Sequence, residues 1–380
     1  MKQEEQLFLH ILNAALHPEN SDLLQEPDLV LIQKNMTSIL SLARSHKILP
    51  PVYELLCRIG CTFSDEEMKS LLPEISTYAL SCYQMSRFTH YVCHLFQDAG
   101  IPFFLLKGTT LSDLYPKPEF RRFGDIDLLI NNDRLFQKAQ QLLLEHGFQI
   151  RKDLVDHHVE FLLIRPERTY LLELHRKVIA SQNSPALHRS LTDIYDNIPT
   201  DAPLPPVFTA LYLLLHMLQH FFSSGFGIKL LCDWVVYLEH ETGNIPAEQL
   251  SDLLQQLGLT GFAQTITELC IRDLGLSAAP ACLRFHSSAE IPFHRKNEVM
   301  DHLADDIFTA GEFGKSDTSR MLIIRKSSHP FHYLREFHHQ MQNRYSASGR
   351  IPLLWPILWA LTGYHFLHNN RHLRRTSTRK

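Results

Sequence analysis

Apolar residues in the first hundred positions recur at spacings of three and four. Leu7, Ile11, Leu12 and Ala15 show this spacing, which places them on one face of an amphipathic helix. Prolines at positions 18, 27, 50 and 51 and the Ser-Asp-Glu-Glu run at 64–67 divide the segment, as helix boundaries commonly do. The pattern predicts an N-terminal helical region over residues 1–97 with four helices.

The pattern changes after Gly100. Residues 101–106 form a short, continuous apolar run, which is typical of a buried strand. Along residues 125–130 the apolar positions 126, 128 and 130 alternate with Asp125, Asp127 and Leu129, so a second strand is expected there with its acids on one face. A periodic helix is expected from Asp133 to a C-terminal cap at Gly147.

Two more strands are expected at residues 158–165 and 169–177. The short connection between them, Pro-Glu-Arg at 166–168, suits an antiparallel hairpin. Residues 98–180 therefore predict an α+β core, a small mixed sheet with helices on one side.

The helical period returns after a proline-rich linker at 199–206. It predicts helices near 211–222, 228–240, 247–258 and 261–274. We therefore expect a C-terminal helical domain over residues 200–345, followed by an apolar segment and basic tail at 346–380.

The apolar segment 351–367 contains two prolines, a glycine and a histidine. It is shorter than the about 20 apolar residues that a transmembrane helix needs. Packing on its own helical domain is the favoured interpretation. Contact with an anionic lipid surface, or with a partner protein through residues 351–380, is left open.

Charge and cysteine content exclude several classes of protein. The 380 residues carry 37 basic and 41 acidic side chains, a formal charge of -4, which predicts no extended nucleic-acid surface. Seven cysteines without a Cys-x-x-Cys pair suggest neither a disulfide framework nor a thiolate zinc site. We expect a cytoplasmic protein, with peripheral membrane association as the alternative.

The candidate chemistry begins with Asp125 and Asp127. Two carboxylates at positions i and i+2 of a strand project from the same face, about 6 to 7 Å apart, so they can share metal ions. Magnesium prefers hard oxygen ligands together with phosphate oxygens of a nucleotide. The structural alternative is a solvated strand end.

A turn suited to phosphate precedes these acids. Gly108 lets the backbone approach a phosphate, and Thr109 starts a short helix and adds a hydroxyl. Lys107 supplies a point charge, and Arg122, which we rank above Arg121, supplies a fork for the same triphosphate. The alternatives are an ordinary tight turn and surface cations.

Taken together, residues 100–108 and 122–130 resemble the bacterial nucleotidyltransferases that share the pattern LKG…R..GDIDLL. These belong to the DNA polymerase beta-type nucleotidyltransferase superfamily. The resemblance implies a polymerase-beta-like core that binds a nucleoside triphosphate with Mg²⁺, including a two-metal site. It implies transfer of a nucleoside monophosphate, most often AMP, to a hydroxyl-type acceptor. The acceptor, a small molecule, peptide or protein, is not identified by the sequence.

The resemblance also extends to Leu172-Glu173-Leu174-His175 and to the helices that follow. It implies that Glu173 is a third carboxylate, a metal ligand and the base for the attacking hydroxyl; pairing with Arg176 or Lys177 is the alternative. It also implies a set of residues that line the nucleotide or acceptor cleft: His175, His216, His220, Lys229 and Asp233.

Two further alternatives stay open. His216 and His220 share one helix face and, with Asp233, form a conceivable zinc site, but the catalytic pattern would place Glu beside the first His. A packed or pocket-lining pair is therefore favoured. The rival to an enzyme is a non-catalytic module that keeps the fold and binds a nucleotide or a partner.

Overall fold

The computed structural model describes residues 2–19, 26–155, 157–179, 185–199, 203–223, 225–285, 293–310, 355–356 and 359–360. Its Cα positions divide the chain into two compact units. The larger unit comprises residues 2–216 and 229–287, and the smaller one the remaining residues. The predicted apolar segment and basic tail lie almost entirely outside the described residues.

Among the described residues of the first hundred there are five helices rather than the four predicted. They are α1 (Gln3–Leu16), α2 (Glu26–Lys34), α3 (Met36–Ser45), α4 (Leu49–Arg58) and α5 (Asp65–Asp98). The prediction was wrong because α2 and α3 are separated at Asn35, where no proline marks a break. Helix α5 begins as expected at Ser64, whose hydroxyl accepts a hydrogen bond from the Glu67 amide, a cap typical of helix starts.

A five-stranded mixed sheet follows α5 in the described part of the chain. Its order is β1-β2-β5-β4-β3. The strands are β1 (Phe104–Leu105), β2 (Asp125–Leu129), β3 (Gln149–Val155), β4 (His158–Ile164) and β5 (Thr169–His175). β2 and β5 are parallel, and the other neighbouring pairs are antiparallel. The predicted α+β class and mixed sheet are confirmed.

The hairpin of β4 and β5 is also confirmed, with Arg165 and Arg168 exchanging backbone hydrogen bonds across the turn. Strand β3 was not predicted. Its sequence, Gln-Ile-Arg-Lys-Asp-Leu-Val, is rich in charge, as edge strands often are, and lacks a long apolar alternation. Such an edge is difficult to distinguish from a polar loop by pattern alone.

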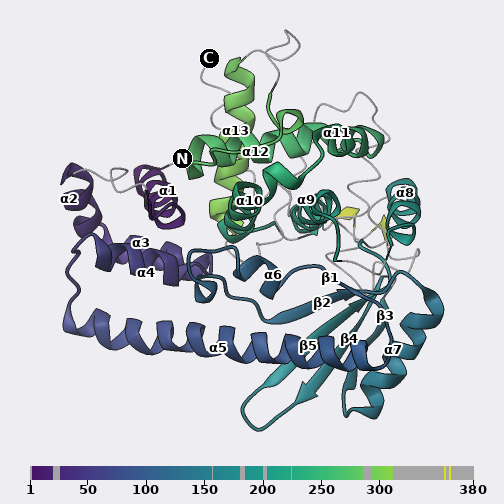
Figure 1. Ribbon diagram of the computed structural model, residues 1–380. Coiled ribbons are helices and arrows are strands. Elements are labelled where there is room, and N and C mark those ends of the chain that lie inside the picture. The colour runs from purple at the N-terminus through teal and green to yellow at the C-terminus, as the bar shows by residue number, and fades with distance from the viewer. Residues whose placement is uncertain are drawn as a thin grey trace. The chain divides into compact units, whose positions relative to one another are not determined.

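One face of the sheet carries the hydrophobic core. Apolar side chains of β2, β4 and β5 pack there against α5 and against α7 (Asp133–Glu145), and Figure 1 shows both helices beside the strands. Representative members are Phe88, Phe161 and Leu172. Because strand side chains alternate, burial of this set directs the acidic residues of the same strands to the opposite face.

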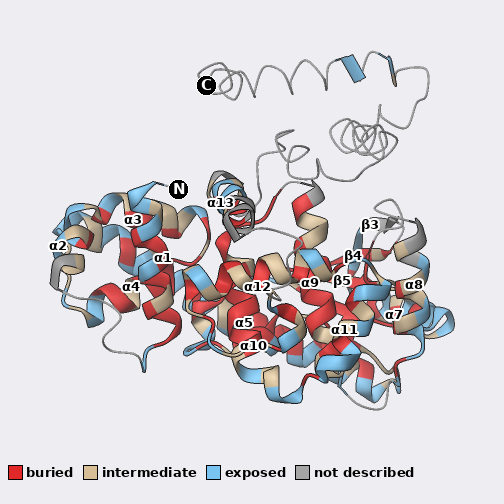
Figure 2. Cartoon of the chain, turned by 90° about the horizontal axis from the view of Figure 1, so that it is seen from above, coloured by how far each residue is buried: buried red, intermediate tan, exposed pale blue. Residues whose placement is uncertain are grey.

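Further helices complete the larger unit. They are α6 (Thr109–Ser112), α8 (Pro185–Asp196), α9 (Pro206–Ser223, as far as His216), α10 (Ile228–Glu241), α11 (Ala247–Gln256) and α12 (Thr260–Leu274). The helices expected beyond the linker are confirmed within a few residues, whereas α8 was not predicted. Helix α10 is buried along most of its length (Figure 2). No described helix is long and apolar enough to cross a membrane.

In the smaller unit, helix α13 (Phe293–Ala310) is described. Its buried residues are Met300, Leu303, Ala304 and Ile307. Their spacing of three and four places them on one face of the helix. The helix is therefore amphipathic, as the sequence of this region would favour.

His46 makes the stability of the N-terminal helices depend on pH. The side chain follows α3 and is fully buried, with its ring 6.4 Å from that of Phe8. Burial lowers the pKa of His46 from 6.5 to about 4. As the pH falls through this window, the unfolded chain takes up a proton that the folded chain excludes, so stability decreases, by up to about 3 kcal/mol.

We therefore expect His46→Asn to lose part of this acid sensitivity. The measurement is the free energy of unfolding in urea at several pH values between 7 and 4. His10→Asn, at an exposed position of α1, is the matched control and should keep the wild-type pH dependence. An identical pH dependence in wild type and His46→Asn would contradict the assignment.

Candidate active site

The acidic residues of the sheet gather on the face opposite the hydrophobic core. Asp125 and Asp127 lie two residues apart on β2, and Glu173 and His175 lie two residues apart on β5. The parallel register pairs Asp127 with Glu173. Cross-strand partners in a sheet share a face, so all four side chains point to the same side.

Lys107 reaches this face from the turn after β1. Its Nζ lies 3.3 Å from Asp127 Oδ1 and 3.8 Å from Asp125 Oδ2. The side chain of Asp127 is 1% exposed, whereas that of Asp125 is 29% exposed. The pair therefore has a buried member and a member that solvent or a ligand can reach.

His175 contacts two of the carboxylates. Its Nε2 lies 3.3 Å from Asp127 Oδ1 and 3.4 Å from Glu173 Oε2. Three carboxylates thus face two groups that can be cationic, Lys107 and His175, which leaves the cluster one negative charge in excess.

The pKa values of these groups follow from that arrangement. Burial by itself would lower the pKa of His175, but hydrogen bonds to Asp127 and Glu173 raise it to about 9. Burial would raise the pKa of Glu173, but His175 and then Lys107 lower it to about 2. Burial is likewise outweighed at Lys107, where Asp125 and Asp127 hold the pKa well above its usual value. At neutral pH Lys107 and His175 are therefore cationic and Glu173 is anionic.

The donor set fits a hard divalent cation. Asp127 Oδ2 is buried and has no hydrogen-bond partner. A buried carboxylate oxygen without a partner is costly, and a bound cation or a hydrogen-bond donor would remove that cost. One ligand atom each from Asp127, Glu173 and His175 lie within 4.8 Å of one another. Carboxylate oxygens of this kind are the ligands that magnesium prefers.

Gly108 gives the turn beside the acids its shape. Its backbone adopts φ 94° and ψ -119°, a conformation that residues with a Cβ rarely adopt. Phe123 lies 3.7 Å from the position that a Cβ would take. The turn is thus specified by backbone conformation rather than by lack of space.

A buried ion pair holds this turn in place. Arg121 donates from Nε and Nη2 to the two oxygens of Asp233 at 2.7 and 3.0 Å, and from Nη1 to the Gly108 carbonyl at 3.2 Å. Tyr115 donates to Asp233 at 2.8 Å. Burial would raise the pKa of Asp233, but Arg121 lowers it. Arg121 therefore links α10 to the Gly108 turn.

Comparison with protein families bears on this site. The profile of the family described as Uncharacterised nucleotidyltransferase matches residues 33–274, which is more than half of the chain. The chain belongs to this nucleotidyltransferase family. No curated protein and no solved structure matches the chain. The match includes the sheet, the acidic cluster and the helices from α3 to α12.

The other predicted site residues of this family member have different environments. Thr109 is buried at the start of α6. Arg122 is exposed, with its guanidinium 5.5 Å from the centre of the Tyr78 ring. His216 stacks on Tyr212, with ring centres 5.9 Å apart.

The remaining predicted residues have separate environments. The pKa of Lys229 is lowered to about 8 by burial and then by Arg121. Asp233 is engaged by Arg121, as described above. His220 belongs to the smaller compact unit, whereas the acidic cluster lies in the larger one. The clusters of metal-ligand side chains found among the described residues lie on β2, β4 and β5 and in the turn before β4, and include neither His216 nor His220.

Two site residues were missed by sequence reasoning. Tyr212 of α9 is buried, and burial followed by the charge of Asp127 raises the pKa of its hydroxyl well above the usual value. Its sequence context is a continuous apolar helix, which gives no signal of a polar role. Arg121 was ranked below Arg122 because adjacent arginines in a loop cannot be told apart without knowing which one is buried.

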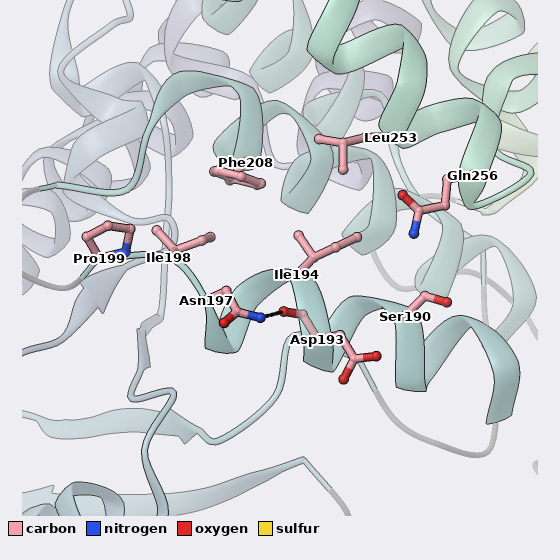
Figure 3. Close-up of a pocket in the computed structure, with 9 residues that line it drawn as sticks. All are labelled: Ser190, Asp193, Ile194, Asn197, Ile198, Pro199, Phe208, Leu253 and Gln256. Atoms are coloured by element: carbon pink, nitrogen blue, oxygen red, sulfur yellow. Dashed lines mark hydrogen bonds between the residues drawn. The ribbon is translucent and has the colours of Figure 1, made fainter.

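Two cavities are lined by residues other than those of the acidic cluster. One of about 470 Å³ is lined by residues of α8, α9 and α11, among them Asp193 and Asn197, which are hydrogen-bonded to each other (Figure 3). Another, of about 950 Å³, is lined mainly by apolar residues and includes Leu105 and Thr110 on either side of the Lys107 turn. Neither contains a predicted site residue.

The substitution Gly108→Ala should lower the free energy of unfolding. Imposing φ 94° on a residue with a Cβ costs about 1 to 3 kcal/mol, or forces the turn to move away from Arg121. We expect a lower midpoint of urea unfolding. Gly124→Ala is the matched control, because Gly124 has open space at the Cβ position, and it should change stability by only a few tenths of a kcal/mol. Equal effects of both substitutions would contradict this account of the turn.

Proposed function

We propose that the chain transfers a nucleoside monophosphate from a Mg²⁺-bound nucleoside triphosphate to a hydroxyl group of an acceptor. The observation that supports this most strongly is the convergence of three carboxylates and a lysine beside a glycine turn in a member of a nucleotidyltransferase family. AMP is the proposed donor group. The acceptor class is left to experiment.

Each residue has a part in the proposed reaction. Asp125, Asp127 and Glu173 hold Mg²⁺, with a second ion in the same carboxylate set. The bound metal would neutralise charge on the phosphates and on the attacking oxygen. The Gly108 turn and Thr109 would bind phosphate oxygens, and Lys107, which contacts Asp125 and Asp127, would supply a positive charge for the triphosphate.

Two roles come into question for Glu173, that of a metal ligand and that of the base for the attacking hydroxyl. A carboxylate with a pKa of about 2 is ionised at neutral pH, which suits a metal ligand, but it is a weak proton acceptor. We therefore propose the ligand role as the principal one. In the reaction the acceptor oxygen forms a bond to the α-phosphorus, the bond to pyrophosphate breaks, and the hydroxyl proton passes to Glu173 or to water.

The proposal is tested by incubating the purified chain with ATP, CTP, GTP or UTP labelled at the α-phosphate, Mg²⁺ and a cell extract. We expect a labelled product to form with one nucleotide in preference to the others, and pyrophosphate to be released. Adding EDTA should stop the labelling. Identification of the labelled product would then reveal the acceptor.

A second experiment distinguishes the proposed enzyme from a non-catalytic binding module. Calorimetric titration with each nucleotide, with and without Mg²⁺, measures binding independently of transfer. Binding that is unaffected by Mg²⁺, with no pyrophosphate release from any nucleotide, would contradict the proposed activity and favour a binding module.

A further inference from the structure

A second group of metal-ligand side chains lies beside the carboxylates, where β4 begins and β5 ends. His157, His158 and His175 each offer a ring nitrogen, and these three atoms lie within 4.8 Å of one another. The antiparallel register pairs His158 of β4 with His175 of β5. The rings are close, with centres 4.3 Å apart for His157 and His158 and 5.1 Å apart for His158 and His175.

We propose that His157, His158 and His175 form a binding site for a first-row transition-metal ion of the Zn²⁺ class. The site adjoins the Mg²⁺ site of the proposed function, because His175 contacts Asp127 and Glu173, and His158 forms a further group with Glu160 and Glu173. Imidazole nitrogen is a preferred ligand of zinc, copper and nickel, whereas magnesium prefers oxygen. The two sites would therefore select different ions by ligand chemistry.

The distance between two of the nitrogens fits a shared metal. His157 Nε2 and His158 Nδ1 are 2.9 Å apart. Two nitrogens bound to one tetrahedral zinc at 2.0 to 2.1 Å are separated by about 3.3 Å. A shift of a few tenths of an ångström would place both nitrogens at ligand distance, so little reorganisation is needed.

His158 also has the partner that a metal-binding histidine commonly has. Its other nitrogen, Nε2, lies 3.6 Å from Glu160 Oε1, and Glu160 Oε2 lies 3.5 Å from Arg151 Nη1. A carboxylate on the far nitrogen fixes the tautomer and orientation of a metal-binding imidazole. Glu160 therefore orients His158 Nδ1 toward His157.

Burial gives the site a second, independent feature. His175 is 5% exposed, and its Nδ1 is buried without a hydrogen-bond partner. A buried ring nitrogen without a partner is costly; a metal ion at this nitrogen would displace its proton, as metal binding to imidazole does, and would remove that cost. Since His175 Nε2 contacts Asp127 and Glu173, an ion held by the three histidines would also fix His175 beside the catalytic carboxylates.

The test is titration of the metal-free full chain with Co²⁺ in the absence of nucleotide, followed by visible ligand-field absorption. We expect a spectrum of a nitrogen-rich, low-coordinate site, and competition by Zn²⁺. His157→Ala and His158→Gln should each weaken binding more than about 100-fold, and Glu160→Gln about 10- to 100-fold. Circular dichroism of each variant establishes that the fold is retained.

Two controls separate this site from the Mg²⁺ site and from other histidines. His90→Ala, at an exposed position of α5, should leave the Co²⁺ spectrum unchanged. Asp125→Asn should also leave the Co²⁺ spectrum unchanged, although the proposed function requires Asp125 for nucleotidyl transfer. The histidine site and the proposed function can therefore fail independently, and the experiment shows which of them has failed. Absence of Co²⁺ binding, or a spectrum that survives His157→Ala and His158→Gln, would overturn the assignment and leave a hydrogen bond between two histidines.

Discussion

Replacement of Asp125 by Asn should lower kcat for nucleotidyl transfer by at least about 10³-fold, since removing one preorganised electrostatic group commonly costs about 10² to 10³ and a metal ligand more. Asp125 is the more exposed of the two strand acids, so the substitution leaves the buried Asp127 contacts with Lys107 and His175 intact. The loss should therefore appear in turnover with little change in stability. The measurement is the rate of pyrophosphate release at saturating nucleotide and Mg²⁺.

Asp252→Asn is the matched control for this prediction. Asp252 is exposed on α11, and its substitution removes the same charge without touching the cluster, so turnover should be unchanged. Wild-type turnover in Asp125→Asn, measured with the same nucleotide, would contradict the proposed role of the strand acids.

The second large effect concerns the buried pair Arg121 and Asp233. Their side chains are 2% and 3% exposed, so removing one partner leaves a buried charge without compensation. Asp233→Asn and Arg121→Met should each lower the free energy of unfolding by about 3 to 5 kcal/mol. Urea unfolding followed by circular dichroism measures this change. Arg121→Met should also weaken nucleotide binding, because Arg121 holds the Gly108 carbonyl.

The double variant Arg121→Met with Asp233→Leu provides the control. Replacing both members of a buried ion pair by apolar residues is often close to neutral in stability, so the double variant should be more stable than either single variant. Its nucleotide affinity should nevertheless stay reduced, because the link to the turn is absent. If the two single effects simply added, coupling between Arg121 and Asp233 would be excluded.

The parts of the site that are close in sequence were accessible to sequence reasoning. Asp125 and Asp127 share a strand, and strand geometry alone places them on one face. The apolar run before Lys107 and the glycine at 108 predict a strand followed by a turn, as the structure shows. Glu173 was reached only through the resemblance, because nothing local states that β5 pairs with β2.

The parts that depend on packing between distant segments were not accessible. Arg121 and Asp233 are 112 residues apart, and neither their burial nor their pairing leaves a local pattern. Tyr212 lies in the apolar run Ala-Leu-Tyr-Leu-Leu-Leu at 210–215 of α9, where it looks like a core residue. The grouping of His157 and His158 with His175 depends on the register of the hairpin, which a shift of one residue would abolish.

The most direct test of the central claim is a crystal structure of the chain with Mn²⁺, which substitutes for Mg²⁺, and a non-hydrolysable nucleoside triphosphate. The account predicts an anomalous Mn²⁺ peak about 2.2 Å from carboxylate oxygens of Asp125 and Asp127, triphosphate density against the Gly108 turn, and Lys107 displaced from the acids onto a phosphate. Mn²⁺ bound elsewhere, or a nucleotide seated away from Gly108 while Lys107 keeps both aspartates, would contradict it.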